Sequence, residues 1–303
     1  MRTMKKLTAV LAASTLALAG CAASDPLDTD DGDNGGDNPG AITIGSADFA
    51  ESQILASIYA LALTDAGIEV EERSNIGSRE VYMLALQDGS IDLVPEYVGA
   101  LLRYVDTEST ETELEDVLPA LDEHLPEGIV YLEPSDAANS NALAVTADTA
   151  DEYGLETFSD VTPHAGEWSI GGPPEWEQRQ NGIVGLRDVY GMEFNEFVAL
   201  DAGGPLSLSA LENGQVEVAN IFTTNPVLAE GGIVALEDDE SLFAVENVTP
   251  VGSEEALSQE AIDVLNSISE QLTTEHLIEL NQLSDDGAPI EQIARDWIDE
   301  NLS

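Results

Sequence analysis

A chain of 303 residues is long enough to bury a large core in one or two domains, and its apolar fraction of 43% is ordinary for a globular protein. The charge is extreme, because 60 acidic residues stand against 9 basic ones and the formal net charge is −51. Such a surface repels nucleic acid phosphates, which excludes nucleic-acid binding. It also repels itself unless salt screens it, so a high-salt habitat is the economical explanation.

The first 20 residues are typical of a secretory signal peptide. Three basic residues precede an apolar run from Leu7 to Ala19, which is too short for a comfortable membrane span. The run ends in Leu-Ala-Gly-Cys and resembles a bacterial lipobox, in which the cysteine, here Cys21, is lipidated. Cys21 is the only cysteine of the chain, so no internal disulfide can form. Residues 21–40 are rich in Asp, Gly and Asn, and we expect them to be a disordered acidic linker.

Residues 85–97 predict a helix end, a short strand and a loop that contacts a ligand. Gly89 suits the left-handed position after a helix, and residues 91–94 are long enough for a buried strand. Pro95 cannot donate to a sheet ladder, so the strand is expected to stop there. Glu96-Tyr97 would then follow the carboxyl end of the strand, where open α/β sheets bind ligands.

This pattern returns later in the chain. Ala210 starts a similar stretch 125 residues after Ala85 (210 − 85 = 125), and residues 168–171 match residues 42–45 at nearly the same offset. Two similar units at one separation predict two similar lobes, whose strand-end loops face one cleft. Chance matching of short apolar strings with glycine is the alternative.

Predicted strands and helices alternate from residue 41 onward. Strands are predicted at residues 42–45, 68–71, 91–94, 129–132, 168–171, 194–200, 216–221 and 233–236. Helices are predicted at residues 51–66, 78–88, 98–104, 112–123, 175–180, 184–190, 206–213, 258–270, 274–283 and 290–300. The alternation indicates an α/β fold with largely parallel sheets.

The chain is expected to cross between two lobes at residues 139–145 and 248–251. Residues 41–140 and 251–303 would then form lobe one, and residues 141–250 would form lobe two. Two crossings make a hinge, an arrangement that closes around a ligand held in the cleft between the lobes.

An ordered set of short motifs runs through the folded part. It includes Ile42-Thr43-Ile44-Gly45-Ser46, Ile91-Asp92-Leu93, Glu96-Tyr97-Val98-Gly99, Pro174-Glu175-Trp176 and Asn247-Val248-Thr249-Pro250-Val251. In order and spacing the set resembles the substrate-binding lipoproteins of ABC importers for osmoprotectants such as glycine betaine, choline and carnitine. The resemblance implies a two-lobed type II periplasmic-binding-protein fold. It also implies delivery of a small zwitterionic or quaternary ammonium solute to an ABC permease and its ATPase subunit, and a lipid anchor at the outer face of the cell membrane.

A quaternary ammonium group is normally held over aromatic faces, and Tyr97, Trp176 and Phe222 are the candidate cage. Core packing is the alternative for each of them. Arg179 is a candidate for gripping a carboxylate with two parallel hydrogen bonds, with a surface ion pair as the alternative. Asp48 is a candidate for facing a cation, with simple solvation as its alternative.

The chain departs from the family pattern at several positions. Ala47 stands where the family usually has lysine, and Asn141 and Glu246 stand at or near positions where it has aromatic residues. These changes reduce the number of aromatic side chains in the candidate cage. The sequence therefore does not identify the ligand among betaine, choline, carnitine, ectoine and an amino acid. A cleft-facing Glu246 would favour an amine with N–H donors, whereas a solvated Glu246 would not.

The sequence gives little support for an enzymatic function. The three histidines, His124, His164 and His276, are scattered and lack metal-binding spacing, and the sequence contains neither a nucleophile elbow nor a phosphate-binding loop. No cofactor and no metal are expected. A secreted hydrolase and a lipid-anchored solute sensor remain the alternatives to a transport binding protein.

Overall fold

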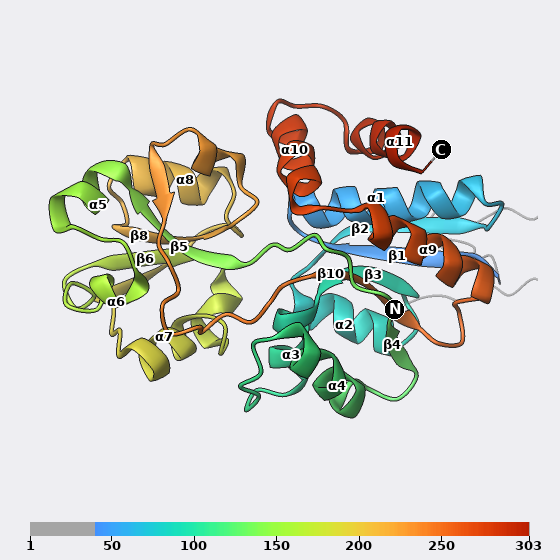
Figure 1. Ribbon diagram of the computed structural model, residues 1–303, viewed down its shortest axis with the longest axis horizontal. Coiled ribbons are helices and arrows are strands. Elements are labelled where there is room, and N and C mark those ends of the chain that lie inside the picture. Colours follow the sequence, from blue (N-terminus) through green and yellow to red (C-terminus); the bar gives the residue numbers. More distant parts are fainter. Residues whose placement is uncertain (1–39, 303) are drawn as a thin grey trace, which may run out of the picture. The chain divides into compact units, whose positions relative to one another are not determined.

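The computed structural model describes residues 40–302, which form two five-stranded sheets covered by helices (Figure 1). The predicted signal peptide, the Cys21 anchor and nearly all of the acidic linker lie outside the described residues. No helix among residues 40–302 is long and apolar enough to cross a membrane.

The first sheet has the strand order β2-β1-β3-β10-β4. Its strands are β1 (Ile42–Ala47), β2 (Val70–Gly77), β3 (Leu93–Tyr97), β4 (Ile129–Tyr131) and β10 (Val248–Ser253). Strands β2, β1 and β3 run parallel, whereas β10 is antiparallel to both of its neighbours. One antiparallel strand, supplied by the late part of the chain, therefore sits inside an otherwise parallel sheet.

The second sheet repeats this topology with the order β7-β6-β8-β5-β9. Its strands are β5 (Asn141–Thr146), β6 (Ser169–Gly172), β7 (Glu196–Ala199), β8 (Val218–Phe222) and β9 (Ile233–Ala235). Here β5 is the antiparallel strand, between β8 and β9.

The repeat predicted from the sequence is present in the structure. Strand β8 begins and ends 125 residues after β3 (218 − 93 and 222 − 97), so Tyr97 and Phe222 are the last residues of equivalent strands. Gly89 and Gly214, which precede these strands, have φ angles of +76° and +66°. This left-handed conformation is the one that glycine adopts without strain after a helix.

The prediction that a strand stops before Pro95 is wrong, because β3 continues to Tyr97. Pro95 lies opposite Pro250 of β10, so neither residue is asked for the N–H that a proline lacks. On its other side β3 pairs with β1 only at Leu93. Glu96 and Tyr97 are therefore strand residues, held by a ladder on one side.

Two groups of helices cover the first sheet. The helices α1 (Ala50–Asp65), α9 (Gln259–Gln271), α10 (Thr274–Asp285) and α11 (Ile290–Asn301) share one apolar cluster with the sheet. The helices α2 (Arg79–Gln87), α3 (Val98–Val105) and α4 (Leu114–His124) share the other. The C-terminal helices thus return to the sheet built by the N-terminal strands (Figure 1).

The second sheet is covered in the same way. One apolar cluster includes α6 (Phe158–Val161), η1 (Pro174–Gln178) and α7 (Ile183–Tyr190), and the other includes α8 (Pro205–Glu212) and η2 (Pro226–Ala229). Helices α5 (Ala147–Tyr153) and α6 were not predicted. Their signal was present, because Thr146 caps α5 and Thr157 with Asp160 forms a capping box at α6.

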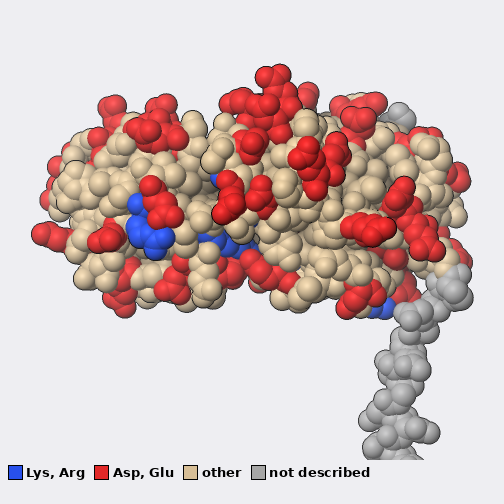
Figure 2. Space-filling view, turned by 90° about the horizontal axis from the view of Figure 1, so that it is seen from below, with Lys and Arg blue, Asp and Glu red and all other residues tan. Residues whose placement is uncertain are grey.

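Acidic side chains are scattered over the face shown in Figure 2, among very few basic ones. Of the six arginines within the described residues, five form ion pairs with carboxylates: Arg73, Arg79, Arg179, Arg187 and Arg295. Most of these arginines thus pair with nearby acids, and the large excess of acidic residues makes the net charge of the chain strongly negative.

Candidate functional site

One pocket brings together residues from both sheets, and aromatic and polar side chains line it, as is typical of small-molecule sites. Its wall includes all seven residues that the sequence singled out as ligand contacts: Asp48, Tyr97, Asn141, Trp176, Arg179, Phe222 and Glu246. They come from the loop after β1, the ends of β3 and β8, the start of β5, the segment before β10, and η1 with the residue that follows it. The pocket therefore lies where the carboxyl ends of equivalent strands face each other.

The pocket has an aromatic side formed by Phe49, Tyr97 and Phe222. The ring centroid of Phe49 lies 6.2 Å from that of Tyr97 and 5.3 Å from that of Phe222, so Phe49 joins the two equivalent strand ends. Sequence reasoning did not single out Phe49 as a ligand contact. Its place directly before α1, after the first strand, is the signal that would have identified it.

Trp176 is both a core residue and a wall of the pocket. Its side chain is only 1% exposed and belongs to the apolar cluster under η1 and α7. The indole Nε1 donates to the carbonyl of Asn181 at 2.6 Å, which fixes the orientation of the ring. Gly172 and Gly182 leave room for this ring, since a Cβ at either would lie within 3.0 Å of an atom of it.

A buried ion pair underlies the pocket. Arg79 donates from Nε and Nη2 to the two carboxylate oxygens of Glu96, at 2.8 Å each, and the Tyr82 hydroxyl donates to the same carboxylate at 2.7 Å. Glu96 is fully buried and Arg79 nearly so, yet Arg79 lines the pocket. Sequence reasoning missed Arg79, because nothing in its local pattern distinguishes it from the other arginines.

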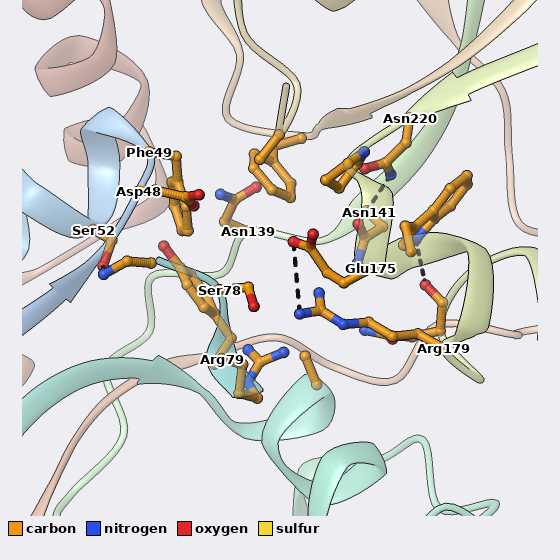
Figure 3. Close-up of a pocket in the computed structure, with 18 of the residues that line it drawn as sticks. Asp48, Phe49, Ser52, Ser78, Arg79, Asn139, Asn141, Glu175, Arg179 and Asn220 are labelled. Carbon is orange, nitrogen blue, oxygen red and sulfur yellow. Dashed lines mark hydrogen bonds and ion pairs between the residues drawn. The ribbon is translucent and has the colours of Figure 1, made fainter. Parts of the chain in front are cut away.

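Arg179 approaches the same part of the pocket as Arg79, from the opposite side (Figure 3). Its Nε and Nη2 donate to Glu80 at 2.9 and 2.7 Å, and Glu175 lies 3.8 Å away. The two-pronged grip that was predicted for a ligand carboxylate is thus engaged by Glu80. Although partial burial raises the pKa of Glu80, hydrogen bonds from Arg179 and Ser78 outweigh it and lower the pKa to about 2.

Glu51, at the start of α1, is the centre of a hydrogen-bond network behind the aromatic side. Its Oε1 accepts from the Tyr97 hydroxyl at 2.6 Å and from Asn139 at 2.7 Å. Its Oε2 accepts from the Thr224 hydroxyl and from Asn281, both at 2.7 Å. Five segments that are distant in sequence are therefore held by one buried carboxylate, which also gains from its place in the first turn of a helix.

Glu246 is buried, with 2% exposure, and accepts a hydrogen bond from the backbone N–H of Ala100 at 2.9 Å. The alternative that Glu246 is solvated is therefore wrong, whereas Asp48 is exposed at the rim of the pocket. Burial raises the pKa of Glu246 to about 8, although Arg79 and Arg103 act in the opposite direction. The Glu246 carboxyl is consequently protonated in much of the folded population at neutral pH.

The raised pKa of Glu246 predicts a specific dependence of stability on pH. In the folded protein this carboxyl keeps its proton up to about pH 8, while in the unfolded chain it ionises near its ordinary value of 4.5. The unfolded state therefore loses its proton first, and unfolding becomes more favourable as pH rises between those values. Compared with Glu246→Gln, we expect the ligand-free wild-type protein to lose up to about 1.4 kcal/mol of unfolding free energy per pH unit in this window. Denaturant melts of both proteins from pH 5 to 8 measure the difference, and parallel curves would refute it.

The charges around the pocket favour a cation or a zwitterion over an anion. Arg79 and Arg179 are each neutralised by a carboxylate outside the pocket lining, Glu96 and Glu80. Two further carboxylates of the lining, Asp48 and Glu175, then leave an acidic balance. Residues 40–302 contain no group of three or more His, Cys, Asp and Glu side chains placed to hold a metal ion.

Comparison with known proteins gives a consistent result. A profile of the family described as "Substrate binding domain of ABC-type glycine betaine transport system" matches residues 40–300. The chain is 28% identical over 258 residues to a carnitine transport binding protein of Listeria monocytogenes, covering 83% of each chain. It is 28% identical over 277 residues to a glycine-betaine-binding protein of Pseudomonas aeruginosa, covering 86% of this chain and 88% of that one. A crystal structure described as a glycine betaine/carnitine/choline ABC transporter superposes with a TM-score of 0.67 at 24% identity, over 86% of this chain and 98% of that chain, and so shares its fold.

Proposed function

The chain belongs to the family of substrate-binding domains of ABC-type glycine betaine transport systems, and on this basis we propose that it captures a small quaternary ammonium or zwitterionic solute outside the cytoplasm and delivers it to an ABC permease and its ATPase subunit. The family is one of solute binders rather than enzymes. The observation that carries the proposal is the aromatic side formed by Phe49, Tyr97 and Phe222, in a pocket with an acidic balance.

The pocket suggests how such a ligand lies. The cationic group would sit against the three aromatic rings, since a desolvated cation gains about 2 kcal/mol or more from an aromatic face. A carboxylate would lie toward Arg79 and Arg179 on the other side, where Nη1 of each arginine forms no hydrogen bond within residues 40–302. Trp176 would close the pocket as a fixed wall.

The two sheets would act as lobes that close on the solute. We assign residues 41–140 and 248–303 to one lobe and residues 141–247 to the other, because the whole of β10 belongs to the first sheet. The two connecting segments lie side by side at a bridge between Ala138 and Asn247, which supports a hinge at this point. The lipobox that ends at Cys21 supports a lipid anchor at the outer face of the membrane, with the acidic linker as a tether.

Binding measurements test the proposal directly. Titration calorimetry at molar NaCl with glycine betaine, choline and carnitine should detect binding of at least one of these solutes. Phe222→Ala should then weaken that binding roughly 10- to 30-fold, because it removes one aromatic face from a desolvated cation.

Phe197→Ala is the matched control for this experiment. Phe197 lies on β7, packs against the core of the second sheet and is not part of the pocket wall. It should lower stability without changing affinity at a temperature where the variant remains folded. Equal losses of affinity in both variants, or no binding of any of the three solutes, would refute the proposed binding mode.

A further inference from the structure

Strand β8 carries a polar side chain at its centre, where its neighbours are apolar. Asn220 is fully buried, while Val218, Ala219 and Ile221 are buried apolar residues of the same strand. Because side chains alternate along a strand, Asn220 shares a face with Phe222, and both residues line the pocket. A buried asparagine in the middle of a sheet is costly unless its amide is fully hydrogen-bonded.

The amide of Asn220 is only half satisfied by the protein. Its Nδ2 donates to Oδ1 of Asn141 at 2.9 Å, and Figure 3 shows this pair on one side of the pocket. Its Oδ1 is buried and has no hydrogen-bond partner among residues 40–302. The Oδ1 of Asn141 accepts one of the two N–H groups of Asn220 Nδ2, and the acceptor Oδ1 is the atom of this amide that is left without any partner within the described part of the chain.

The residues around the Asn220 amide leave room for it. A Cβ at Gly172 would lie 3.4 Å from Cβ of Asn220 and 2.9 Å from the ring of Trp176, so a larger residue at this position would crowd both side chains. Thus β6 provides a glycine, β5 provides Asn141, and β8 provides the acceptor itself. Three strands of the second sheet contribute to one polar position next to the aromatic side.

We infer that the ligand carries a hydrogen-bond donor, a hydroxyl or an N–H group, which it gives to Oδ1 of Asn220. The inference rests on the proposed function and narrows its substrate class. Glycine betaine has a trimethylammonium group and a carboxylate and therefore no donor, so it leaves this oxygen unpaired when the lobes close. A site built to hydrogen-bond one group rejects an analogue that lacks the group far more strongly than a hydrophobic pocket rejects a missing methyl.

Two pairs of probes, each differing in one donor, test this on the wild-type protein. Carnitine has a hydroxyl that γ-butyrobetaine lacks, and N,N-dimethylglycine has an N–H that glycine betaine lacks. We expect the donor-bearing member of at least one pair to bind about 10- to 100-fold more tightly by calorimetry at molar NaCl. The pair that shows the preference distinguishes a hydroxyl ligand from an amine ligand.

The variant Asn220→Leu adds an independent readout, since leucine has the same number and branching of side-chain heavy atoms and no acceptor. It should bring the affinity ratio within the responsive pair to within about threefold of one, mainly by weakening the donor-bearing probe. Asn195→Leu is the matched control, because Asn195 is exposed and lies outside the pocket wall. It should leave the ratio unchanged.

The outcomes separate this inference from the function beneath it. Equal binding within both pairs on the wild-type protein would overturn the inference, because the amide would then present its N–H to the ligand, and the proposed function would stand. Binding of none of the four probes, with none of glycine betaine, choline and carnitine, would overturn both. An unfolded Asn220→Leu variant leaves the wild-type comparison decisive.

Discussion

Glu51→Ala is expected to lower the unfolding free energy by roughly 3 to 5 kcal/mol and to abolish measurable ligand binding at micromolar concentrations. Three of the four donors that now meet this carboxylate would lose their acceptor, while Asn281 would keep its bonds to Thr224, and a buried donor without a partner costs about 1 to 3 kcal/mol. The estimate is lower than the sum because water can enter the space that alanine leaves. Binding should fail as well, since the freed hydroxyl belongs to Tyr97 on the aromatic side of the pocket.

Glu51→Gln gives a graded version of the same experiment. Glutamine keeps one acceptor oxygen, which can serve either the Tyr97 and Asn139 pair or the Thr224 and Asn281 pair, and its NH2 group then faces the other donors. We expect about half of the loss in stability seen with alanine.

The matched control for Glu51 is Glu115→Ala, at an exposed position in the first turn of α4. A surface change of this kind should stay within about 0.5 kcal/mol. Denaturant melts at molar NaCl measure all three variants. A Glu51→Ala variant as stable as Glu115→Ala would show that the network contributes nothing to the fold.

The two-sheet architecture could be predicted from the sequence because short local patterns mark the repeat. A glycine in the left-handed conformation ends each equivalent helix, and a short apolar strand follows at an offset of 125 residues (214 − 89). The same offset relates Tyr97 to Phe222 (222 − 97 = 125), and the structure places both at the end of equivalent strands and in one pocket. The end of β3 was mispredicted because the sequence of one strand does not show which residue lies opposite its proline. A strand accepts a proline where the neighbouring strand requires no N–H from it, and here the residue opposite Pro95 is Pro250.

The polar interior of the site was not predictable in the same way. Glu51 joins residues that are 46, 88, 173 and 230 positions away, and no local pattern links them. Arg79 looks like any helix-start arginine until β3 brings Glu96 beside it. Of the polar residues that sequence reasoning missed, Asn220 had a local signal, as a polar residue inside an apolar strand.

Arg79→Met is expected to destabilise the protein by about 3 to 5 kcal/mol, because it leaves a fully buried carboxylate without its cation. The Tyr82 hydroxyl and the backbone N–H of Tyr97 would remain as donors to Glu96, and neither carries charge. Removing only the charge by adding Glu96→Gln to Arg79→Met should restore most of the loss. Buried pairs are replaced at little cost when both partners become neutral.

This double variant distinguishes two explanations for the instability of Arg79→Met: the loss of a stabilising ion pair, or the cost of leaving one buried charge without a partner. If the pair itself supplied the stability, Arg79→Met with Glu96→Gln would be as unstable as Arg79→Met alone. If desolvation dominates, as full burial of Glu96 indicates, the double variant would melt close to the wild-type protein while binding its ligand more weakly, since Arg79 lines the pocket. Arg187→Met, which removes an exposed pair with Asp188, sets the scale for a surface arginine at within about 1 kcal/mol. Stability that recovers without affinity would show that evolution keeps the buried Arg79–Glu96 pair for the solute and not for the fold.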